Sequence, residues 1–413
     1  MTKEKIAVLG GGSFGTVLAN IAASNGSSVS LWVRDSENAL RINSESSNSQ
    51  YHPELELSSN IIASDDLKYV IANAQIILIA VPSIIFEDVI ERIKSFVDKD
   101  AMIISCTKGI KSDPFRSMTD IIHSKIDFAN ENNVGVLSGP NLAKEIAENK
   151  IAGTVIASKN NLLISKVKSL LSSKTFKVFS SNDIQGVELS GALKNVYAII
   201  CGIAESLNVG ENALGLILTR SMAEMSRFAV AKGANPITFL GLSGMGDLVA
   251  TCTSNLSRNF QLGVCLGEGL SLEESKNNVG QIAEGLRTLE VLKKEAEKLN
   301  ISMPLVNSLH NLINKETLEY LPKGAVVTNV ARGDIVDDEA LIDALNRRKV
   351  YAVGLDVYKG EPNLNPGYIK HKSAFILPHL GSATKETRTA MANLAIDNLE
   401  EFFKTGNCKN KVN

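Results

Sequence analysis

The chain has 413 residues and a formal net charge of −2, from 43 Lys and Arg against 45 Asp and Glu. Hydrophobic residues make up 44% of it and charged residues 21%, which is typical of a globular protein and excludes a disordered or collagen-like chain. The near-neutral charge gives no reason to expect binding to nucleic acid or to an anionic membrane surface, and the length predicts about two to three domains.

The first part of the chain predicts an α/β domain. Short apolar runs alternate with helical stretches, which is typical of a parallel sheet covered by helices. Five runs are predicted as strands: Lys5–Leu9, Ser28–Val33, Ile76–Val81, Met102–Ser105 and Val134–Leu137. We expect this first domain to comprise residues 1–182.

From Asp183 the pattern changes to long apolar-rich helical segments without convincing strands. The clearest are Gln185–Leu207, Ala213–Ala231 and Ile282–Leu299, so an all-helical domain is expected over residues 183–315. Beyond it, residues 316–413 are expected to form a further α/β fragment. Its predicted strands are Ala325–Ala331, Ala352–Val357 and Ala374–Leu377.

No targeting or membrane segment is predicted. Only Ile6 to Leu9 precede the first glycines, and the most apolar stretch, Ile76–Phe86, is shorter than the roughly 18 residues that span a bilayer. The five cysteines contain no C-x-x-C pair, so no disulfide framework or zinc site is expected from Cys106, Cys201, Cys252, Cys265 and Cys408. We expect a cytoplasmic protein.

A glycine-rich motif follows the first predicted strand. Gly10-Gly-Gly12-Ser-Phe-Gly15 has the spacing G-x-G-x-x-G between a strand and a helix, which a dinucleotide-binding loop requires. Gly10 permits a tight turn, Gly12 lets the backbone approach a pyrophosphate, and Gly15 allows close packing of helix on strand. The motif predicts a Rossmann-type domain that binds NAD or NADP. A glycine-rich turn without a ligand is the alternative.

Two charged residues end the second predicted strand. Asp35 stands 20 residues after Gly15, where an acidic side chain can hold the adenosine ribose. The neighbouring Arg34 suits the additional phosphate of NADP through bidentate hydrogen bonds. An exposed charge pair without a ligand is equally compatible with the pattern, so the choice between NAD and NADP stays open.

One cation interrupts an apolar predicted helix. Lys194 lies between Leu193 and Asn195, and burial lowers the pKa of a lysine from about 10.4 towards values useful for proton transfer. Taken alone, the pattern also fits a lysine whose ammonium reaches the surface.

Two polar segments strengthen the prediction of a site. Asp247 and Thr251 are four residues apart, on one face of a helix. Further on, Ser257-Arg258-Asn259 offers a hydroxyl, a cation and an amide for an anionic group such as a phosphate, or simply a polar helix start.

Residues 1 to about 315 resemble the bacterial NAD(P)-dependent glycerol-3-phosphate dehydrogenases. The resemblance runs through ordered motifs: Gly10–Gly15, Cys106–Gly109, Ser138–Ala143, Gly191–Asn195, Gly246–Leu248, Ser257–Asn259 and Glu284–Gly285. It implies reversible hydride transfer between a nicotinamide and dihydroxyacetone phosphate, giving sn-glycerol 3-phosphate for phospholipid synthesis. It also implies a homodimer, and no metal is needed.

The resemblance implies roles residue by residue. Lys194 would be the catalytic proton donor and acceptor, Lys108 would polarise the substrate oxygen, and Asn195, Asp247 and Thr251 would form the hydrogen-bonded surround. The implied substrate-binding residues are Lys108, Gly139, Asn141, Lys194, Asp247, Ser257, Arg258 and Asn259. The implied cofactor-binding residues are Gly10, Gly12, Ser13, Phe14, Gly15, Arg34, Lys108, Ala143, Arg258, Ile282 and Glu284.

After about Asn314 the chain departs from that family. Residues 316–413 resemble the C-terminal part of D-isomer-specific 2-hydroxyacid dehydrogenases. There, the matching residues are the carboxylate-binding Arg332, the acid–base pair His379 and Glu361, and Asp356 beside the nicotinamide. No G-x-G-x-x-G occurs in this stretch, so we expect the chain to be a fusion whose last part contributes no catalysis. The alternatives are an inactive or weakly nucleotide-binding fusion product and, less favoured, a 2-hydroxyacid dehydrogenase.

Overall fold

The computed structural model describes residues 4–270, 272–280, 284–310, 318, 321–330, 333, 336–381 and 384–405, the side chain of Met391 excepted. The chain divides into two compact units, residues 1–309 and 310–413, which are described separately below.

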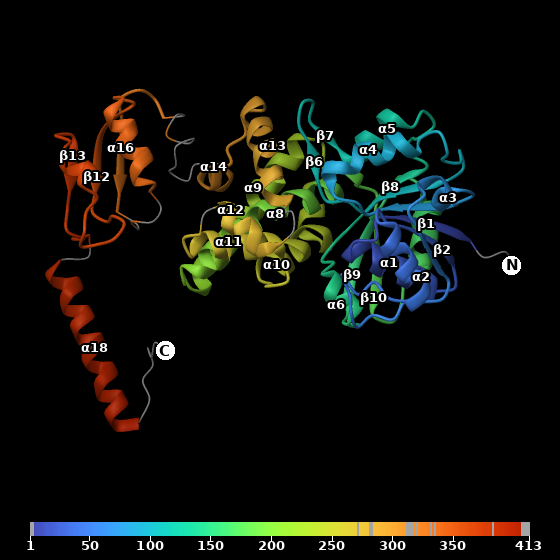
Figure 1. Ribbon diagram of the computed structural model, residues 1–413, viewed down its shortest axis with the longest axis horizontal. Coiled ribbons are helices and arrows are strands. Elements are labelled where there is room, and N and C mark those ends of the chain that lie inside the picture. The colour runs from blue at the N-terminus through green and yellow to red at the C-terminus, as the bar shows by residue number, and fades with distance from the viewer. Residues whose placement is uncertain are drawn as a thin grey trace. The chain divides into compact units, whose positions relative to one another are not determined.

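An eight-stranded sheet forms the centre of the first unit, with the strand order β10-β9-β8-β5-β4-β1-β2-β3 (Figure 1). The strands are β1 (Lys5–Leu9), β2 (Ser28–Trp32), β3 (Ile61–Ser64), β4 (Ile76–Ile79), β5 (Met102–Ser105), β8 (Val134–Ser138), β9 (Ala152–Ala157) and β10 (Phe176–Ser181). The five predicted strands are confirmed, and β3, β9 and β10 were missed. All neighbours are parallel except β8 and β9, so the expectation of a parallel sheet is wrong at that one pair. Only residues 139–151 join β8 to β9, and the chain turns back instead of crossing over.

Helices cover both faces of this sheet. They are α1 (Ser13–Ser24), α2 (Ser36–Glu45), α3 (Leu67–Ile71), α4 (Ser83–Ile93), α5 (Met118–Lys125), α6 (Ala143–Ala147) and α7 (Asn161–Leu171), with a small hairpin of β6 (Ile110–Lys111) and β7 (Arg116–Ser117). Strand β1 shows why the sheet is buried on both sides. Ile6 and Val8 belong to one apolar core, and Ala7 and Leu9 to the other. The predicted Rossmann-type domain is confirmed.

A helical domain follows in the same unit. Its elements are α8 (Ile184–Ser206), α9 (Glu211–Ala231), the 3-10 helix η1 (Pro236–Leu240), the π-helical turn η2 (Leu242–Gly246), α10 (Asp247–Cys252), α11 (Arg258–Gly267), α12 (Leu272–Val279), α13 (Glu284–Lys298) and α14 (Pro304–His310). Helix α8 packs against α9, α10, α11 and α13. Gly202 and Gly263 permit its close approach to α11, because a Cβ at Gly263 would lie 2.0 Å from the carbonyl oxygen of Ile199. The predicted all-helical domain is confirmed.

Helix α8 is also the one helix among the described residues with the length and composition to cross a membrane. In that apolar window 89% of the residues are buried inside the protein, as in the core helix of a globular domain. Near its start, Glu188 reaches the sheet domain and accepts hydrogen bonds from the backbone N–H (2.9 Å) and hydroxyl (2.5 Å) of Thr119 on α5. Burial raises the pKa of Glu188 to about 7, although the bonds from Thr119 oppose this shift.

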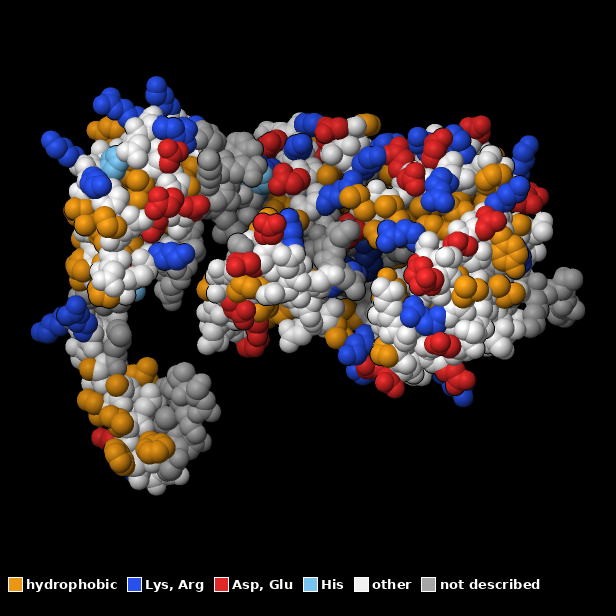
Figure 2. Space-filling view, in the orientation of Figure 1, with side chains coloured by type: hydrophobic (Ala, Val, Ile, Leu, Met, Phe, Trp, Pro, Cys, Tyr) orange, Lys and Arg blue, Asp and Glu red, His pale blue; other side chains and the backbone are white. Residues whose placement is uncertain are grey.

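The second unit contains a three-stranded parallel sheet, β11 (Ala325–Asn329), β12 (Val350–Leu355) and β13 (Ala374–Ile376), in that order. Helices α16 (Asp338–Asn346) and α17 (Pro366–Ile369) contribute to its core, around Leu341, Leu345 and Tyr368. Large apolar side chains remain 62–70% exposed on the strands, namely Val326, Tyr351 and Phe375. No described residue of the last helix, α18 (Lys385–Thr405), is buried, and Figure 2 shows apolar side chains along it.

Candidate active site

The glycine-rich loop joins β1 to α1 and has the shape of a dinucleotide-binding turn. Gly10 has a φ of +119°, and a Cβ there would lie 2.6 Å from the carbonyl oxygen of Ala80. A Cβ at Gly15 would lie 1.9 Å from the Gly10 oxygen, whereas one at Gly12 would meet no atom within 4 Å. Gly12 is also the N-cap of α1 and provides no capping side chain. The open side at Gly12 and the uncapped N–H groups of α1 therefore fit a pyrophosphate.

Two buried side chains hold this loop from behind. The Asn48 amide donates to the Gly11 carbonyl (2.9 Å) and to the Thr16 hydroxyl (2.8 Å). His52 Nε2 lies 2.8 Å from the Ser13 carbonyl oxygen and 3.0 Å from its hydroxyl. A carbonyl oxygen can only accept, so Nε2 carries the hydrogen and the Ser13 hydroxyl keeps its own hydrogen for a ligand. Sequence reasoning missed both side chains, because nothing local marks their contacts with a loop some 40 residues away.

The residues predicted to surround the rest of the cofactor are placed as follows. Arg34 and Asp35 are exposed, and Asp35 accepts a hydrogen bond from the Glu37 backbone N–H (3.1 Å) as the N-cap of α2. Asp35 thus has a structural partner in α2, and contact of either residue with a cofactor stays a prediction. Phe14 and Ala143 are partly buried against the core beneath the loop. Ile282 lies outside the described residues.

Lys194 is buried, and its ammonium stays inside the protein. It is only 5% exposed, so the alternative of an ammonium that reaches the surface is wrong. Its Nζ donates to the Asp247 carboxylate and to the Thr251 hydroxyl. Burial lowers the pKa of Lys194 to about 7, and the Asp247 carboxylate opposes this shift. Asp247 and Thr251 lie on one face of α10, as predicted, and the Thr251 hydroxyl is 3.4 Å from Asp247 Oδ1.

Lys108 approaches the same carboxylate from the sheet domain. Its Nζ lies 2.7 Å from Asp247 Oδ2 and 2.8 Å from the Gly139 carbonyl oxygen. Asp247 is fully buried. Its carboxylate forms ion pairs with two lysines, Lys194 on α8 and Lys108 after β5. The shared carboxylate holds two ammonium groups in one place. Two neighbouring cations can stabilise a substrate oxygen on which negative charge develops during a reaction.

Small residues and buried amides surround this centre. A Cβ at Gly191, one turn before Lys194, would lie 2.2 Å from the Ser138 hydroxyl, so glycine is required there for α8 to approach the end of β8. Asn195 is buried next to Lys194. The Asn141 amide donates to the Thr154 hydroxyl (3.0 Å). Thr154 on β9 was not predicted, because β9 itself was missed.

The proposed phosphate-binding segment begins α11. Ser257 is the N-cap and accepts from the Phe260 backbone N–H (3.3 Å), so the interpretation as a polar helix start is correct for this residue. Asn259 is buried and accepts from the Gly285 N–H (2.9 Å). Arg258 is exposed at the first position of the helix.

Glu284, predicted to bind the cofactor, reaches the sheet domain. Its carboxylate accepts from the backbone N–H (3.0 Å) and hydroxyl (2.5 Å) of Ser83, at the start of α4. This contact places the helical domain against the carboxyl end of β4, near the glycine-rich loop that follows the neighbouring β1. A role of Glu284 towards a cofactor stays a prediction.

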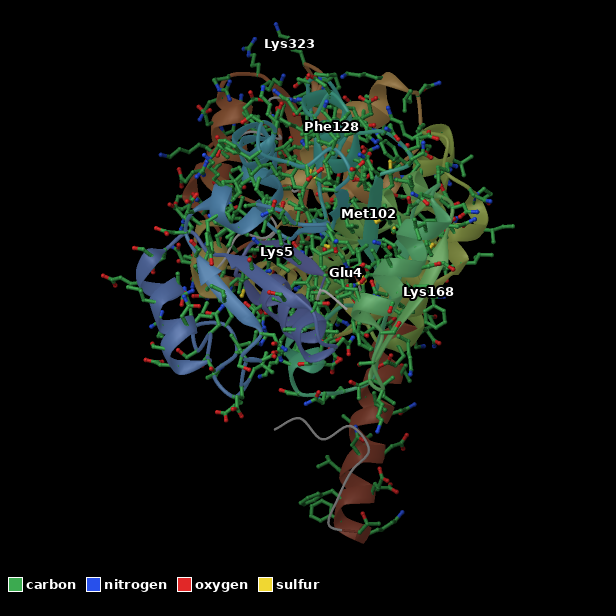
Figure 3. All side chains as sticks on the ribbon, turned by 90° about the vertical axis from the view of Figure 1, so that its right-hand side faces the viewer. Glu4, Lys5, Met102, Phe128, Lys168 and Lys323 are labelled. Atoms are coloured by element: carbon green, nitrogen blue, oxygen red, sulfur yellow. The ribbon has the colours of Figure 1, made fainter. Side chains whose placement is uncertain are left out.

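These residues converge at the carboxyl edge of the sheet. Figure 3 marks Lys5 and Met102, the first residues of β1 and β5, so the loops with Gly12 and Lys108 lie at the opposite ends of these strands. In Figure 2 a hollow lies between the sheet domain and the helical domain, and Lys and Arg side chains lie within it. Among the described residues, no group of three or more His, Cys, Asp or Glu could hold a metal ion.

In the second unit, the predicted pair is formed on the surface. His379 Nδ1 lies 2.9 Å from Glu361 Oε2, and the Asp356 carboxylate accepts from the backbone N–H groups of Leu380 (2.6 Å) and Gly381 (2.7 Å). The hydrogen bond from His379 lowers the pKa of Glu361. Arg332 lies outside the described residues.

Comparison with known proteins identifies the family. Residues 5–163 match the N-terminal domain of NAD-dependent glycerol-3-phosphate dehydrogenase, and residues 183–319 match its C-terminal domain. Glycerol-3-phosphate dehydrogenase [NAD(P)+] of Alcanivorax borkumensis is 49% identical over 315 residues, which cover 76% of this chain and 91% of that protein. The enzyme of the same name from Saccharophagus degradans is 46% identical over 324 residues, or 90% of its length. A crystal structure of glycerol-3-phosphate dehydrogenase from Coxiella burnetii has a TM-score of 0.72 and 36% identity, over 76% of this chain and 95% of that one. The chain belongs to the NAD-dependent glycerol-3-phosphate dehydrogenase family.

Proposed function

We propose that this protein interconverts dihydroxyacetone phosphate and sn-glycerol 3-phosphate with NAD(P)H, and so supplies glycerol phosphate for phospholipid synthesis. The observation that carries the proposal is the buried centre in which Asp247 bridges Lys194 and Lys108, at the sheet edge that also presents the glycine-rich loop. Family membership over residues 5–319 supports the same reaction.

The two lysines would have different roles at the substrate oxygen: Lys194 transfers the proton and Lys108 polarises the oxygen. When bound, the reduced nicotinamide supplies the hydride. Lys194 uses two of its three hydrogens on Asp247 and Thr251, which leaves the third for the oxygen of the ketone. Its pKa of about 7 allows it to donate a proton in reduction and to accept one in oxidation near neutral pH. Lys108 likewise has one hydrogen left after bonding to Asp247 and Gly139.

The cofactor site follows from the loop geometry. Gly10, Gly12 and Gly15 shape the turn, the Ser13 hydroxyl and the α1 N–H groups would bind the pyrophosphate, and Phe14 and Ala143 would line the site. Arg34 would contact the 2′-phosphate of NADP, while Asp35 is already engaged as the α2 cap. From the first position of α11, Arg258 would bind the substrate phosphate, together with the adjacent Ser257 and Asn259.

The test is NADPH oxidation with dihydroxyacetone phosphate as substrate. Wild-type protein should show turnover, and Lys194→Met should lose at least about 10² of it while still binding NADPH, since only the proton source is removed. Lys232→Met is the matched control, because Lys232 pairs with Glu295 at 2.5 Å outside this centre. Absence of turnover in the wild type, or full turnover in Lys194→Met, would contradict the proposal.

We infer further that residues 316–413 derive from a D-isomer-specific 2-hydroxyacid dehydrogenase and are catalytically idle. The exposed pair His379–Glu361 supports the resemblance. The sequence of residues 316–413 contains no G-x-G-x-x-G motif, so we expect this part to offer no phosphate-binding turn that would position a hydride donor. Glyoxylate and hydroxypyruvate should therefore not be reduced above background. Reduction that disappears in His379→Ala would show a second working site.

We also propose domain boundaries, an oligomeric state and a cellular location for the protein. We place the boundaries at 182/183 and 315/316. Asp183 caps α8 and the first compact unit extends to residue 309, whereas residues 315 and 316 lie outside the described residues. A cytoplasmic homodimer is proposed, supported by Leu207, Val209 and Leu216, which are 45–61% exposed around the α8–α9 turn. Light scattering after gel filtration measures the assembly, and a monomeric mass would contradict it.

A further inference from the structure

We propose that Thr154 fixes the orientation of the Asn141 amide, so that Asn141 offers the reaction centre a hydrogen-bond acceptor and thereby selects ketones that carry a neighbouring hydroxyl group. Thr154 is thus a positioning residue for specificity. This inference rests on the proposed reduction of dihydroxyacetone phosphate.

The Thr154 side chain is held by two contacts of its hydroxyl group. Thr154 is fully buried on β9, and its hydroxyl lies 3.2 Å from the Ser138 carbonyl oxygen and 3.0 Å from Asn141 Nδ2. Ser138 and Asn141 flank Gly139, whose carbonyl oxygen accepts from the Lys108 ammonium at 2.8 Å. Thr154 therefore contacts the same short segment, Ser138 to Asn141, whose Gly139 carbonyl binds the Lys108 ammonium.

Counting hydrogens determines which way the amide points. The Ser138 carbonyl can only accept, so the single hydroxyl hydrogen of Thr154 is given to it. The Thr154 oxygen can then only accept from Asn141, which requires the NH₂ group of Asn141 to face Thr154. The carbonyl oxygen of Asn141 is consequently left on the other side of the amide.

That oxygen has no hydrogen-bond partner among the residues that the structure describes. Asn141 Oδ1 is buried without a hydrogen bond, and so is the Ser138 hydroxyl of the same loop. Leaving a buried acceptor unpaired costs about 1–3 kcal/mol, which a ligand with a suitable donor can offset. A ligand hydroxyl can donate to Asn141 Oδ1, since it carries a hydrogen of its own.

The proposed substrate has one polar group that still needs a partner. Its ketone oxygen is assigned to Lys194 and Lys108 and its phosphate to Arg258, whereas its terminal hydroxyl is not yet assigned. A site built to bind a substrate hydroxyl rejects an analogue without it far more strongly than an apolar pocket would, because its own polar groups are left unpaired. We therefore assign the terminal hydroxyl to Asn141, in the orientation that Thr154 imposes.

The experiment compares dihydroxyacetone phosphate with hydroxyacetone phosphate, the same ketone with a methyl group in place of the hydroxyl. The measured quantity is the ratio of kcat/KM for the two substrates in wild type, Thr154→Val and Thr154→Ser. Valine has the shape of threonine without its hydroxyl, so the amide is free to turn and the ratio should fall at least about tenfold. Serine keeps the hydroxyl and should restore the ratio.

Each outcome of this experiment bears on the inference in a different way. An unchanged ratio in Thr154→Val, with wild-type thermal stability, would overturn the inference. A wild-type ratio combined with weaker NADPH binding in that variant would also overturn it, because Asn141 would then face the cofactor. If Thr154→Val does not fold, Asn141→Leu tests the same assignment at the other residue of the pair, and a retained ratio there refutes it. Failure of the proposed function itself would appear separately, as wild-type protein that reduces neither substrate.

Discussion

Replacing Asp247 by asparagine should move the pH dependence of ketone reduction to lower pH. Reduction requires the protonated form of Lys194, whose pKa is about 7, so wild-type activity should fall as the pH rises through about 7, and oxidation should rise over the same range. The Asp247 carboxylate raises the pKa of Lys194 and Lys108 lowers it. The neutral amide of the Asp247→Asn variant would therefore leave two neighbouring cations without their shared anion.

The magnitude follows from the burial of the pair. Removing one partner of a buried ion pair typically costs about 3–5 kcal/mol, and one pKa unit corresponds to about 1.4 kcal/mol, so a shift of roughly 2–4 units is the upper limit. Because Asp247 also binds Lys108 and Thr251, which can rearrange, we expect a shift of at least about one unit.

The assay is kcat and kcat/KM for dihydroxyacetone phosphate between pH 5 and 9, at saturating NADPH. The ionisation of the substrate is common to both enzymes, so the difference between their profiles isolates the protein group. Thr251→Val is the matched control, since it removes a neutral partner of Lys194 and should move the profile less. A profile for Asp247→Asn that coincides with wild type, in a variant with normal thermal stability, would refute the assignment of Lys194 as the proton donor.

Three further predictions address the binding sites. Arg258→Ala should raise the KM for dihydroxyacetone phosphate, whereas Arg220→Ala, an exposed arginine on α9, should not; equal KM values would move the phosphate site elsewhere. Arg34→Ala should weaken NADPH binding by about 1.5–3 kcal/mol and NADH binding much less, as measured by fluorescence titration, and equal losses would mean that Arg34 does not bind the 2′-phosphate. His52→Leu should raise the Kd of both cofactors about two- to tenfold by releasing Ser13, while His371→Leu in the second unit should leave it unchanged, and tight binding in His52→Leu would show that Ser13 needs no such support.

Local sequence was sufficient for the helices and for the charged centre. Lys194 stands out because a cation within an apolar helix needs partners, and the four-residue spacing of Asp247 and Thr251 places both on one face. The glycine-rich loop is equally local, since its three glycines act within one turn. These features depend on contacts between residues close in the chain or on a strong chemical mismatch.

Long-range contacts account for what the sequence did not reveal. The contacts of His52 with Ser13 and of Glu188 with Thr119 join segments 39 and 69 residues apart, and no local pattern predicts such pairs. The antiparallel direction of β9 is set by the short connection that precedes it, and missing this strand concealed Thr154. The sequence marked Asp35 as a residue that could hold a ribose, but it did not reveal the capping contact of Asp35 with the Glu37 N–H at the start of α2.

Three carboxylates of the helical domain end on the sheet domain: Glu188 on Thr119, Asp247 on Lys108 and Glu284 on Ser83. If the two domains separated, Glu188 and Glu284 would lose the partners named here and Asp247 would lose one of its two lysines, so the contact between the domains resists opening. A helical domain transplanted from a relative would therefore need matching residues at all three positions of the recipient. Chimeric enzymes made by exchanging domains in this family should therefore preserve these three contacts. A well-chosen crossover point does not by itself keep the two domains compatible.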